Sequence, residues 1–354
     1  MRATILARGA LAAVTVGAAG LGYAALEAQA FTLRRFTVPV LPPGSPRLTV
    51  LHVSDIHLLP RQHRKAAWVH ALADLEPDLV ISTGDNIAGP GAVPAALAAQ
   101  APLLARPGVF VLGSNDYFGP KPKNPARYLL RHGGRRRIKG LRLPTDDLVK
   151  GFLDAGWVDL GNARATLTVR GLRLDFVGVD DPHLKRDRYR TVAGPADPAA
   201  ALTIGVAHAP YRRVLDAMTA DGARLLLAGH THGGQLCLPG YGTLVTNCDL
   251  PRRQARGLSR WAVPATQAPD GPGSSGAPTD RPGGSGDPAD EAAGRGQSAD
   301  ETGGSGPPTG TRVPGGSREA WLHVSAGIGT SPYTPVRFAC RPEASLLTLV
   351  PRTA

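Results

Sequence analysis

Aromatic residues and cysteines are both scarce in this sequence, and each shortage narrows the kinds of site that it can hold. Phe, Trp and Tyr together make up 5% of the 354 residues. The three cysteines, Cys237, Cys248 and Cys340, show no C-x-x-C spacing. The sequence therefore indicates neither a disulfide scaffold nor a thiolate zinc site. It leaves open one disulfide, between Cys237 and Cys248, and the cysteines do not fix the cellular compartment.

Negative charge is also in deficit, because the formal net charge is +12 at pH 7 and the pI is about 10.2. Such an excess suits an anionic partner: nucleic acid, an anionic membrane surface or a phosphorylated substrate. Much of it lies between Lys121 and Arg142, where Arg131–Arg142 contains no aromatic residue. A groove for single-stranded nucleic acid needs stacking surfaces between its charges, so this segment favours a phosphate-attracting rim or a lipid-headgroup contact. A solvated basic loop is the alternative.

The amino terminus contains a long run without charge. Arg2 and Arg8 precede it, and Gly9–Leu26 is about long enough to cross a hydrocarbon core of ~30 Å. Ala28-Gln-Ala30 resembles a signal-peptidase site, but the run exceeds the usual signal h-region of roughly 7–15 residues. We therefore expect residues 1–30 to form a membrane anchor or signal segment. A retained anchor is favoured over a cleaved signal or a buried helix.

Apolar runs and helical periodicity alternate through the next part of the chain. After a Pro-containing lead-in over residues 31–47, the pattern predicts strand, helix, strand, helix and strand, which is typical of an α/β sheet. The later half predicts a hairpin joined at Gly171 and then further strands. The predicted strands are Leu48–Val53, Leu79–Ser82, Val109–Leu112, Arg164–Val169, Leu172–Val177, Leu202–Val206, Leu225–Leu227, Ala320–Ser325 and Ser345–Val350, and the predicted helices are Lys65–Leu75 and Pro94–Leu104.

Residues 264–318 differ in composition from everything around them. They consist largely of Gly, Pro, Ser, Thr, Ala and Asp and include no aromatic residue. This composition cannot bury enough apolar surface to offset the entropy of ordering, so we predict that the segment is disordered. Its flanks, Trp261–Val263 and Ala320–Val324, are expected to be two strands of one sheet. The insert is then an expanded surface loop within a single domain of residues 48–354.

Polar side chains follow the predicted strands in five short clusters. The carboxyl ends of strands are where open α/β sheets place their binding sites. Carboxylate, amide and imidazole groups gathered there can hold two divalent ions ~3.5–4 Å apart if one carboxylate bridges them. Asp85 is the natural bridge, because Gly84 lets the backbone approach closely. The clusters are Asp55-Ile-His57, Gly84-Asp85, Gly113-Ser-Asn115-Asp116, His208 and Gly229-His-Thr-His232.

These clusters resemble the signature of the calcineurin-like metallophosphoesterases, D-x-H, GD, GN-H, H and GH-x-H. The resemblance covers Leu48–Val263 and resumes over Trp321–Val350. Gly229–Leu236 is similar to the corresponding segment of the branch that includes UDP-diacylglucosamine pyrophosphohydrolase-like enzymes. The resemblance implies an α/β (α+β) fold, a four-layer αββα metallophosphoesterase sandwich with two mixed β-sheets, here preceded by an N-terminal hydrophobic helix.

The resemblance also implies roles for individual residues. Two divalent ions would be the cofactors, and a mixture of oxygen and nitrogen ligands suits manganese, iron or zinc. A metal-bridging hydroxide would attack phosphorus in line, and Asn115 would help to stabilise charge on the phosphoryl oxygens. One ion would be held by Asp55, His57, Asp85 and His232, and the other by Asp85, Asn115, His208 and His230.

The sequence departs from the family pattern at two positions. The family usually follows the ligand Asn with a His that assists the leaving group, and Asp116 takes that position in this chain. We predict that Asn115 and Asp116 are the catalytic side chains. An ionised Asp116 is a poor proton donor, so leaving groups that need little protonation are favoured. Ala88 replaces the second Asp of GD-x-x-D, which is not among the assigned ligands.

The sequence also predicts roles for Asp181 and His52. Asp181, in Asp180-Asp-Pro-His183, is a candidate substrate contact, and a turn capped by aspartates is the equal alternative. His52 alternates into a buried strand and is predicted to be a satisfied core histidine. The remaining histidines carry no functional signal, and they are His63, His70, His132 and His323.

The expected function is a two-metal phosphoesterase that hydrolyses a phosphodiester, pyrophosphate or phosphomonoester. Membrane attachment and basic charge favour a lipid-linked or envelope-associated phosphate and an extracytoplasmic catalytic domain. The flanking charges, Arg2 and Arg8 against Arg34 and Arg35, nearly balance, so the side of the membrane stays open. The alternatives are a nuclease with the same metal centre, for which nucleic acid is the less favoured partner, and a non-catalytic metal- or phosphate-binding envelope protein. The oligomeric state is not indicated.

Overall fold

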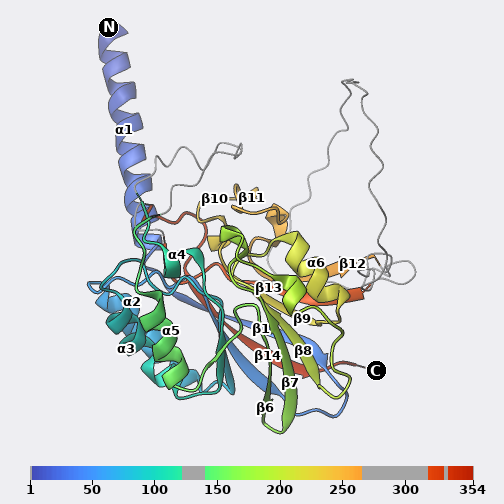
Figure 1. Cartoon of the computed structure of the whole chain (residues 1–354). Helices are drawn as coiled ribbons and strands as arrows, with labels where there is room; N and C mark the ends of the chain where they lie inside the picture. The colour runs from blue at the N-terminus through green and yellow to red at the C-terminus, as the bar shows by residue number, and fades with distance from the viewer. Residues whose placement is uncertain (1, 122–139, 265–317, 331–333, 354) are drawn as a thin grey trace, which may run out of the picture.

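The computed structural model describes residues 2–121, 140–264, 318–330 and 334–353. The basic run around Arg135–Arg137, His132 and nearly all of the predicted disordered insert lie outside the described residues. Two six-stranded sheets pack face to face in the described part (Figure 1). The first has the order β1-β14-β2-β3-β4-β5 and the second the order β12-β13-β9-β8-β7-β6.

The first sheet is mixed. Its strands β2, β3, β4 and β5 run parallel, whereas β14 pairs antiparallel with β2 and parallel with β1. Buried Val, Ile and Leu residues fill these strands, as expected for strands covered on both faces. The bounds are β1 Thr32–Leu41, β2 Leu48–Val53, β3 Leu79–Ser82, β4 Gly108–Phe110, β5 Val158–Asp159 and β14 Glu343–Pro351.

The second sheet is mixed in the same way. Parallel strands β7, β8, β9 and β13 lie at its centre, and β6 and β12 pair antiparallel at its two edges. Trp261 pairs with Ala320 in the register of β12 and β13, so the flanks of the insert are neighbouring strands, as predicted. The bounds are β6 Arg164–Val169, β7 Leu172–Gly178, β8 Leu202–Val206, β9 Leu225–Ala228, β12 Gly257–Val263 and β13 Arg318–Val324.

Helices cover the outer face of each sheet and complete four layers (Figure 1). Helices α2, α3 and α5 pack on the first sheet, and α6 packs on the second. An apolar core between the sheets joins Val50 and Leu347 of one to Phe176 and Ile204 of the other. The predicted αββα sandwich with two mixed sheets is therefore confirmed. The helix bounds are α2 His63–Ala71, α3 Val93–Leu104, α4 Ser114–Tyr117, α5 Thr145–Asp154 and α6 Arg212–Ala220.

The amino-terminal helix α1, Arg2–Glu27, projects away from the sandwich (Figure 1). Its carboxyl end docks on the chain near Phe338, where the Tyr23 and Phe338 rings meet edge to face. The Glu27 carboxylate accepts the backbone N–H groups of Ala339 and Cys340, at 2.9 and 2.8 Å. Within the described residues, none of the helices combines the length and apolar character needed to span a bilayer.

Two sequence expectations differ from the structure. The segment predicted as a lead-in, residues 31–47, contains β1, which pairs with β14 along its length and so belongs to the first sheet. The pattern did not predict this strand because Arg34 and Arg35, which are both exposed, interrupt the alternation of apolar and polar residues. The disulfide left open between Cys237 and Cys248 is absent, because all three cysteines are free.

Candidate metal centre

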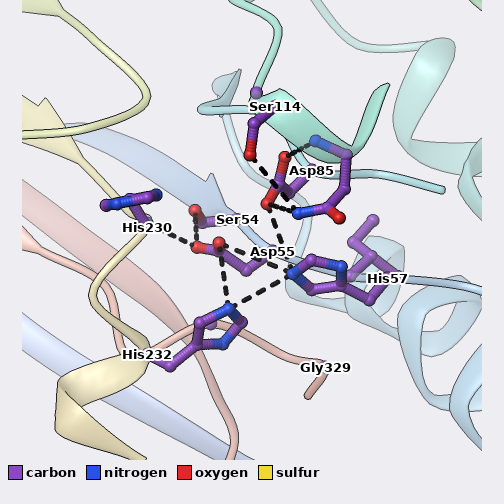
Figure 2. A network of polar contacts seen from close by, with 12 residues as sticks. Ser54, Asp55, His57, Asp85, Ser114, His230, His232 and Gly329 are labelled. Carbon is purple, nitrogen blue, oxygen red and sulfur yellow. Dashed lines mark hydrogen bonds and ion pairs between the residues drawn. The ribbon is translucent and has the colours of Figure 1, made fainter. Parts of the chain in front are cut away.

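The predicted ligands gather where parallel strands of both sheets end. Asp55 and His57 follow β2, Asp85 follows β3, His208 follows β8, and His230 and His232 follow β9. Parallel strands direct their carboxyl ends to one edge, so the face-to-face packing of the sheets brings the two halves of the site together. Figure 2 shows Asp55, His57, Asp85, His230 and His232 converging on one small space.

Two compact groups of potential ligand atoms share Asp55. One consists of Asp55, His57 and His232, and the other of Asp55, Asp85 and His208, with all ligand atoms in each group within 4.8 Å of one another. The Oδ2 atom of Asp85 lies 3.4 Å from His57 Nε2 and 3.5 Å from His208 Nε2. Asp85, a member of the second group, therefore also approaches His57 of the first group, as a bridging ligand would.

Several buried polar atoms of the site have no hydrogen-bond partner among the described residues. They include Asp55 Oδ1, His208 Nε2 and His230 Nε2. Buried polar atoms are normally paired, so a group of unpaired ones that converge indicates a missing ligand. The combination of carboxylate oxygens and imidazole nitrogens fits divalent manganese, iron or zinc. The residues present therefore fit a pair of such ions.

The tautomer of His208 is fixed by the backbone. Its Nδ1 atom lies 2.7 Å from the carbonyl oxygen of Thr83, which can only accept, so Nδ1 carries the proton. The Nε2 lone pair is then directed at the site, which is the arrangement by which a carbonyl orients a metal-binding imidazole. His230 is tied in through its backbone, whose N–H donates to Asp55 Oδ2 at 2.9 Å.

Burial and neighbouring charge set the protonation states of the site. Burial lowers the pKa of His230 to about 3 and that of His232 to about 4, so both imidazoles are neutral near pH 7. Burial raises the pKa of Asp85 to about 7, with the charges of Asp55 and Asp116 adding to the effect. Burial opposes protonation of His208, but Asp85 and Asp55 outweigh it and raise its pKa to about 9. Without cations the centre therefore retains protons that bound metal would displace.

The backbone at the ligands is strained. Asp55, His57, Asp85, His230 and His232 have φ angles of 50°, 45°, 56°, 68° and 51°. Residues other than glycine rarely adopt this left-handed region, and such conformations cost on the order of 1–3 kcal/mol each. Strain that recurs after β2, β3 and β9 indicates a site whose geometry is held by the surrounding fold.

Two glycines allow the strand ends to approach one another. A Cβ atom on Gly84, whose φ is +91°, would collide with the backbone of Gly113. A Cβ atom on Gly229 would collide with the Ser54 side chain. The expectation that Gly84 permits a close backbone approach is therefore confirmed, and Gly229 has the same role between the two sheets.

Asp116 lies behind the candidate ligands, and its predicted catalytic role stays a prediction. Its fully buried carboxylate accepts the backbone N–H groups of Asp85 and Asn86, each at 2.7 Å, and that of Gly113 at 3.0 Å. Both oxygens are thus occupied in joining the turns after β3 and β4. The carboxylate therefore holds the backbone that carries Asp85.

Asn115 contacts the central carboxylate directly. Its backbone N–H and its side-chain Nδ2 donate to the two oxygens of Asp85, each at 2.7 Å. With the amide turned over, its oxygen would occupy the Nδ2 position, beside Asp85 Oδ2, and such amide orientations are assigned from hydrogen bonding. Ligation by Asn115 stays a prediction. Ser114, for which the sequence predicts no role, accepts a hydrogen bond from Asn115 Nδ2 at 3.5 Å (Figure 2).

Asp181 caps a turn, the alternative that the sequence left open, and its role as a substrate contact stays a prediction. It is fully buried, and its Oδ1 atom accepts the backbone N–H of His183 at 2.8 Å at the start of the short helix Pro182–Leu184. This cap directs the His183 ring against His230, with ring centroids 4.2 Å apart. His183 belongs to the segment that the sequence offered as a possible substrate contact, but its position beside His230 depends on the fold.

Two buried cations support the ligand turns, and the residue pattern carries no signal for either. The Lys65 ammonium donates to the carbonyl oxygens of Ile56 and His57, at 2.9 and 3.3 Å. The Arg337 guanidinium is fully buried and donates to the carbonyl oxygens of His232 and Gly329, at 3.3 and 2.6 Å. Both act on the backbone, which residue type alone cannot reveal.

The interior histidines behave as predicted for His52. Its Nδ1 shares a hydrogen bond of 2.9 Å with His323 Nδ1, and its Nε2 shares one of 2.9 Å with Thr83 Oγ1. His52 is therefore a satisfied core histidine. His323, which carried no signal, is its partner across the two sheets.

The chain is similar in sequence to proteins of one known family. A family model described as calcineurin-like phosphoesterase matches residues 48–234. The uncharacterized protein YpbG of Bacillus subtilis (strain 168) is 29% identical over 206 residues, which cover 56% of this chain and 66% of that protein. An uncharacterized metallophosphoesterase of Aquifex aeolicus (strain VF5) is 28% identical over 240 residues, covering 65% of this chain and 78% of the relative.

Among solved structures, a 5'-nucleotidase precursor from Thermus thermophilus is similar at 14% identity, with a TM-score of 0.35, over 55% of this chain and 44% of the other. Phosphopantetheinyl hydrolase from Mycobacterium tuberculosis is similar at 17% identity, with a TM-score of 0.29, over 55% of this chain and 84% of the other. The match spans less than two thirds of YpbG and of the nucleotidase precursor. The family model and the two relatives give no support to the narrower resemblance to UDP-diacylglucosamine pyrophosphohydrolase-like enzymes.

Proposed function

The chain belongs to the calcineurin-like phosphoesterase family, and we propose that this metallophosphoesterase hydrolyses a phosphodiester, pyrophosphate or phosphomonoester at the edge where β2, β3, β8 and β9 end. The observation that carries the proposal is the position of Asp85 Oδ2, 3.4 Å from His57 Nε2 and 3.5 Å from His208 Nε2. One carboxylate oxygen that approaches imidazole ligands of both groups is what a binuclear centre requires.

The candidate ligands divide into two sets, one for each ion. Asp55, His57 and His232 would hold one ion, and Asp85 and His208, with His230 beside them, would hold the other. When bound, a pair of divalent ions lowers the pKa of water and neutralises charge on phosphoryl oxygens.

The residues around the ligands have orienting roles. Asn115 holds the Asp85 carboxylate through two hydrogen bonds, and Asp116 fixes the turn beneath it. Because its carboxylate accepts backbone N–H groups behind the site, Asp116 is not placed to offer a proton to the leaving group. We therefore retain the expectation that leaving groups which need little protonation are favoured.

We also propose that the substrate is lipid-linked or associated with the cell envelope. The excess positive charge suits a phosphorylated partner. On α1, the side chains of Val14, Val16, Leu21 and Leu26 are exposed, which suits contact with an apolar phase. Membrane association and an extracytoplasmic catalytic domain are parts of the same proposal.

The test of the reaction class is hydrolysis of bis-p-nitrophenyl phosphate and p-nitrophenyl phosphate by the full chain, with manganese, iron or zinc added to separate samples. We expect metal-dependent release of p-nitrophenol that disappears in Asp85→Asn, because the amide cannot bridge two cations. The faster ester identifies diester or monoester chemistry. A wild-type chain that neither binds metal nor releases p-nitrophenol would refute the proposal.

A further inference from the structure

A cleft of about 640 Å³ lies beside the metal centre, outside the ligand set described above. Its walls come from the turn after β7 and from the start of α6. Volumes of about 300–1,000 Å³ are typical of sites for small organic molecules. The residues that matter to its chemistry are Pro182, His183, Leu184, Lys185, Tyr211 and Arg213.

His183 connects the cleft with the metal centre. The His183 ring lines the cleft and contacts the His230 ring, with centroids 4.2 Å apart. The His183 ring therefore separates the cleft from His230, a candidate metal ligand. A phosphoryl group held at the centre would leave its substituent close enough to enter the cleft.

Hydrogen bonds and a cation–ring contact hold the wall of the cleft in place. Asp181 caps the turn that carries His183, and His183 Nδ1 shares a hydrogen bond of 3.2 Å with the Tyr211 hydroxyl. Asp180 Oδ2 accepts from Arg186 Nε at 2.7 Å, and the Arg186 guanidinium stacks over the Tyr117 ring at 4.1 Å. The same turn is thus tied to the β4 side of the site, so the cleft has a fixed distance from the metal centre.

The charge of the cleft is positive at Lys185. The Arg213 guanidinium, the other cation of the wall, donates to both carboxylate oxygens of Asp187, at 2.7 and 2.8 Å, and is neutralised by it. Lys185 is exposed and has no ion-pair or hydrogen-bond partner for its ammonium among the residues that the structure describes. Its backbone is held in place by a hydrogen bond from its own N–H to the Pro182 carbonyl oxygen, at 3.2 Å.

We propose that this cleft binds the leaving group of the substrate, and that this group carries a second negative charge on an apolar body. The Tyr211 ring, with Pro182 and Leu184, offers apolar surface to the body, and Lys185 attracts the second anionic group. The substrate class is therefore an organic phosphoester whose alcohol portion bears an additional carboxylate or phosphate. The inference rests on the proposed function and narrows it.

The test compares two esters with the same phosphoryl group and with phenol leaving groups of similar acidity, phenyl and 4-carboxyphenyl. They are used as diesters or monoesters, whichever the wild-type chain hydrolyses. We expect the carboxylate to raise kcat/KM about three- to fivefold, through KM, because one exposed charge pair contributes up to ~1 kcal/mol. The preference should shrink at high ionic strength, since salt screens exposed charges.

Variants of two lysines decide whether Lys185 causes the preference. In Lys185→Gln the ratio of kcat/KM for the two esters should fall to about one, and Lys185→Arg should retain most of it. Lys150→Gln is the matched control, because Lys150 is exposed on α5 and pairs with Asp154. It should leave both rates unchanged.

Each outcome has a definite meaning. Equal kcat/KM for the two esters in the wild-type chain, or a preference that survives in Lys185→Gln, overturns this inference alone and leaves the proposed function standing. Failure of the wild-type chain to hydrolyse either ester with metal present overturns the proposed function together with the inference.

Discussion

Two pairs of histidines join the two sheets of this molecule, one in the interior and one at the metal centre. In the interior, His52 of β2 meets His323 of β13, and the second nitrogen of His52 reaches Thr83 Oγ1 at 2.9 Å. At the centre, His57 follows β2 and His232 follows β9, with their Nε2 atoms 3.2 Å apart. Both pairs are therefore close contacts between buried or nearly buried rings drawn from the same two halves of the chain.

Burial alone does not separate the two pairs. It lowers the pKa of His52 to about 3 and that of His232 to about 4, so both are neutral near pH 7. Carboxylates and backbone conformation do separate them. His57 and His232 face Asp55 Oδ1 at 3.9 and 3.6 Å and have left-handed backbones, whereas His52 lies in a regular strand. A buried histidine pair thus indicates a metal site when carboxylates and strained backbone accompany it.

The strongest test of this difference is His57→Gln. It removes one imidazole from the group of Asp55, His57 and His232, so we expect one metal site to be lost. Activity should fall more than about 100-fold, because loss of outer partners of metal ligands already costs 10–100-fold. Metal content measured by mass spectrometry and hydrolysis of bis-p-nitrophenyl phosphate check the two effects.

The matched control for His57→Gln is His63→Gln. His63 is exposed at the start of α2, six positions further along the same segment. It should keep both metal content and activity. If His57→Gln retained two ions per chain and normal turnover, the assignment of His57 to the centre would be wrong.

The interior pair should respond in the opposite way. His323→Leu leaves His52 Nδ1 without its partner, and an unsatisfied buried polar group costs about 1–3 kcal/mol. We expect the free energy of unfolding in urea to fall by that amount while two ions per chain remain bound. In His52→Leu/His323→Leu, where both partners are removed, the combined loss should be smaller than the sum of the two single losses. A loss of metal from His323→Leu without a loss of stability would contradict the claim that the interior pair supports stability and does not hold metal.

The same contrast explains which parts of the molecule the sequence predicts. Asp55, Asp85 and His208 could be found because each follows a buried apolar run, and strand ends meet at one edge of a sheet. The layered fold follows from the alternation of predicted strands and helices along the chain. These features depend on local pattern, which a single sequence carries.

Orientation and long-range contact could not be predicted in this way. Asp116 adjoins Asn115 in sequence, yet its carboxylate points behind the site to four backbone N–H groups. His183 reaches the centre because the fold brings the turn after β7 against His230, which follows β9. Arg337 acts on carbonyl oxygens that are far from it in the chain, and a backbone acceptor leaves no mark in the residue pattern.

The smallest predicted effect is a pH dependence that belongs to the interior pair. Burial lowers the pKa of His52 to about 3 and holds that of His323 well below its ordinary value. Both stay neutral in the folded chain, whereas in the unfolded chain each takes up a proton below about pH 6.5. The stabilisation that depends on their neutrality is therefore complete above that pH and is lost as the pH falls. Each histidine contributes a slope of about 1.4 kcal/mol per pH unit.

Comparison with His323→Leu isolates this contribution. In chelator-treated protein, urea unfolding between about pH 7 and pH 5 should show the stability of the wild type falling more steeply than that of the variant, because the variant has one titrating histidine fewer. The Asp85 carboxyl, whose pKa burial raises to about 7, gives a slope of opposite sign. It is present in both proteins and cancels in the difference. A wild type and variant with parallel pH profiles would mean that His323 is already protonated in the fold, and that the interior pair differs from the metal-centre pair for a reason other than its hydrogen bonds.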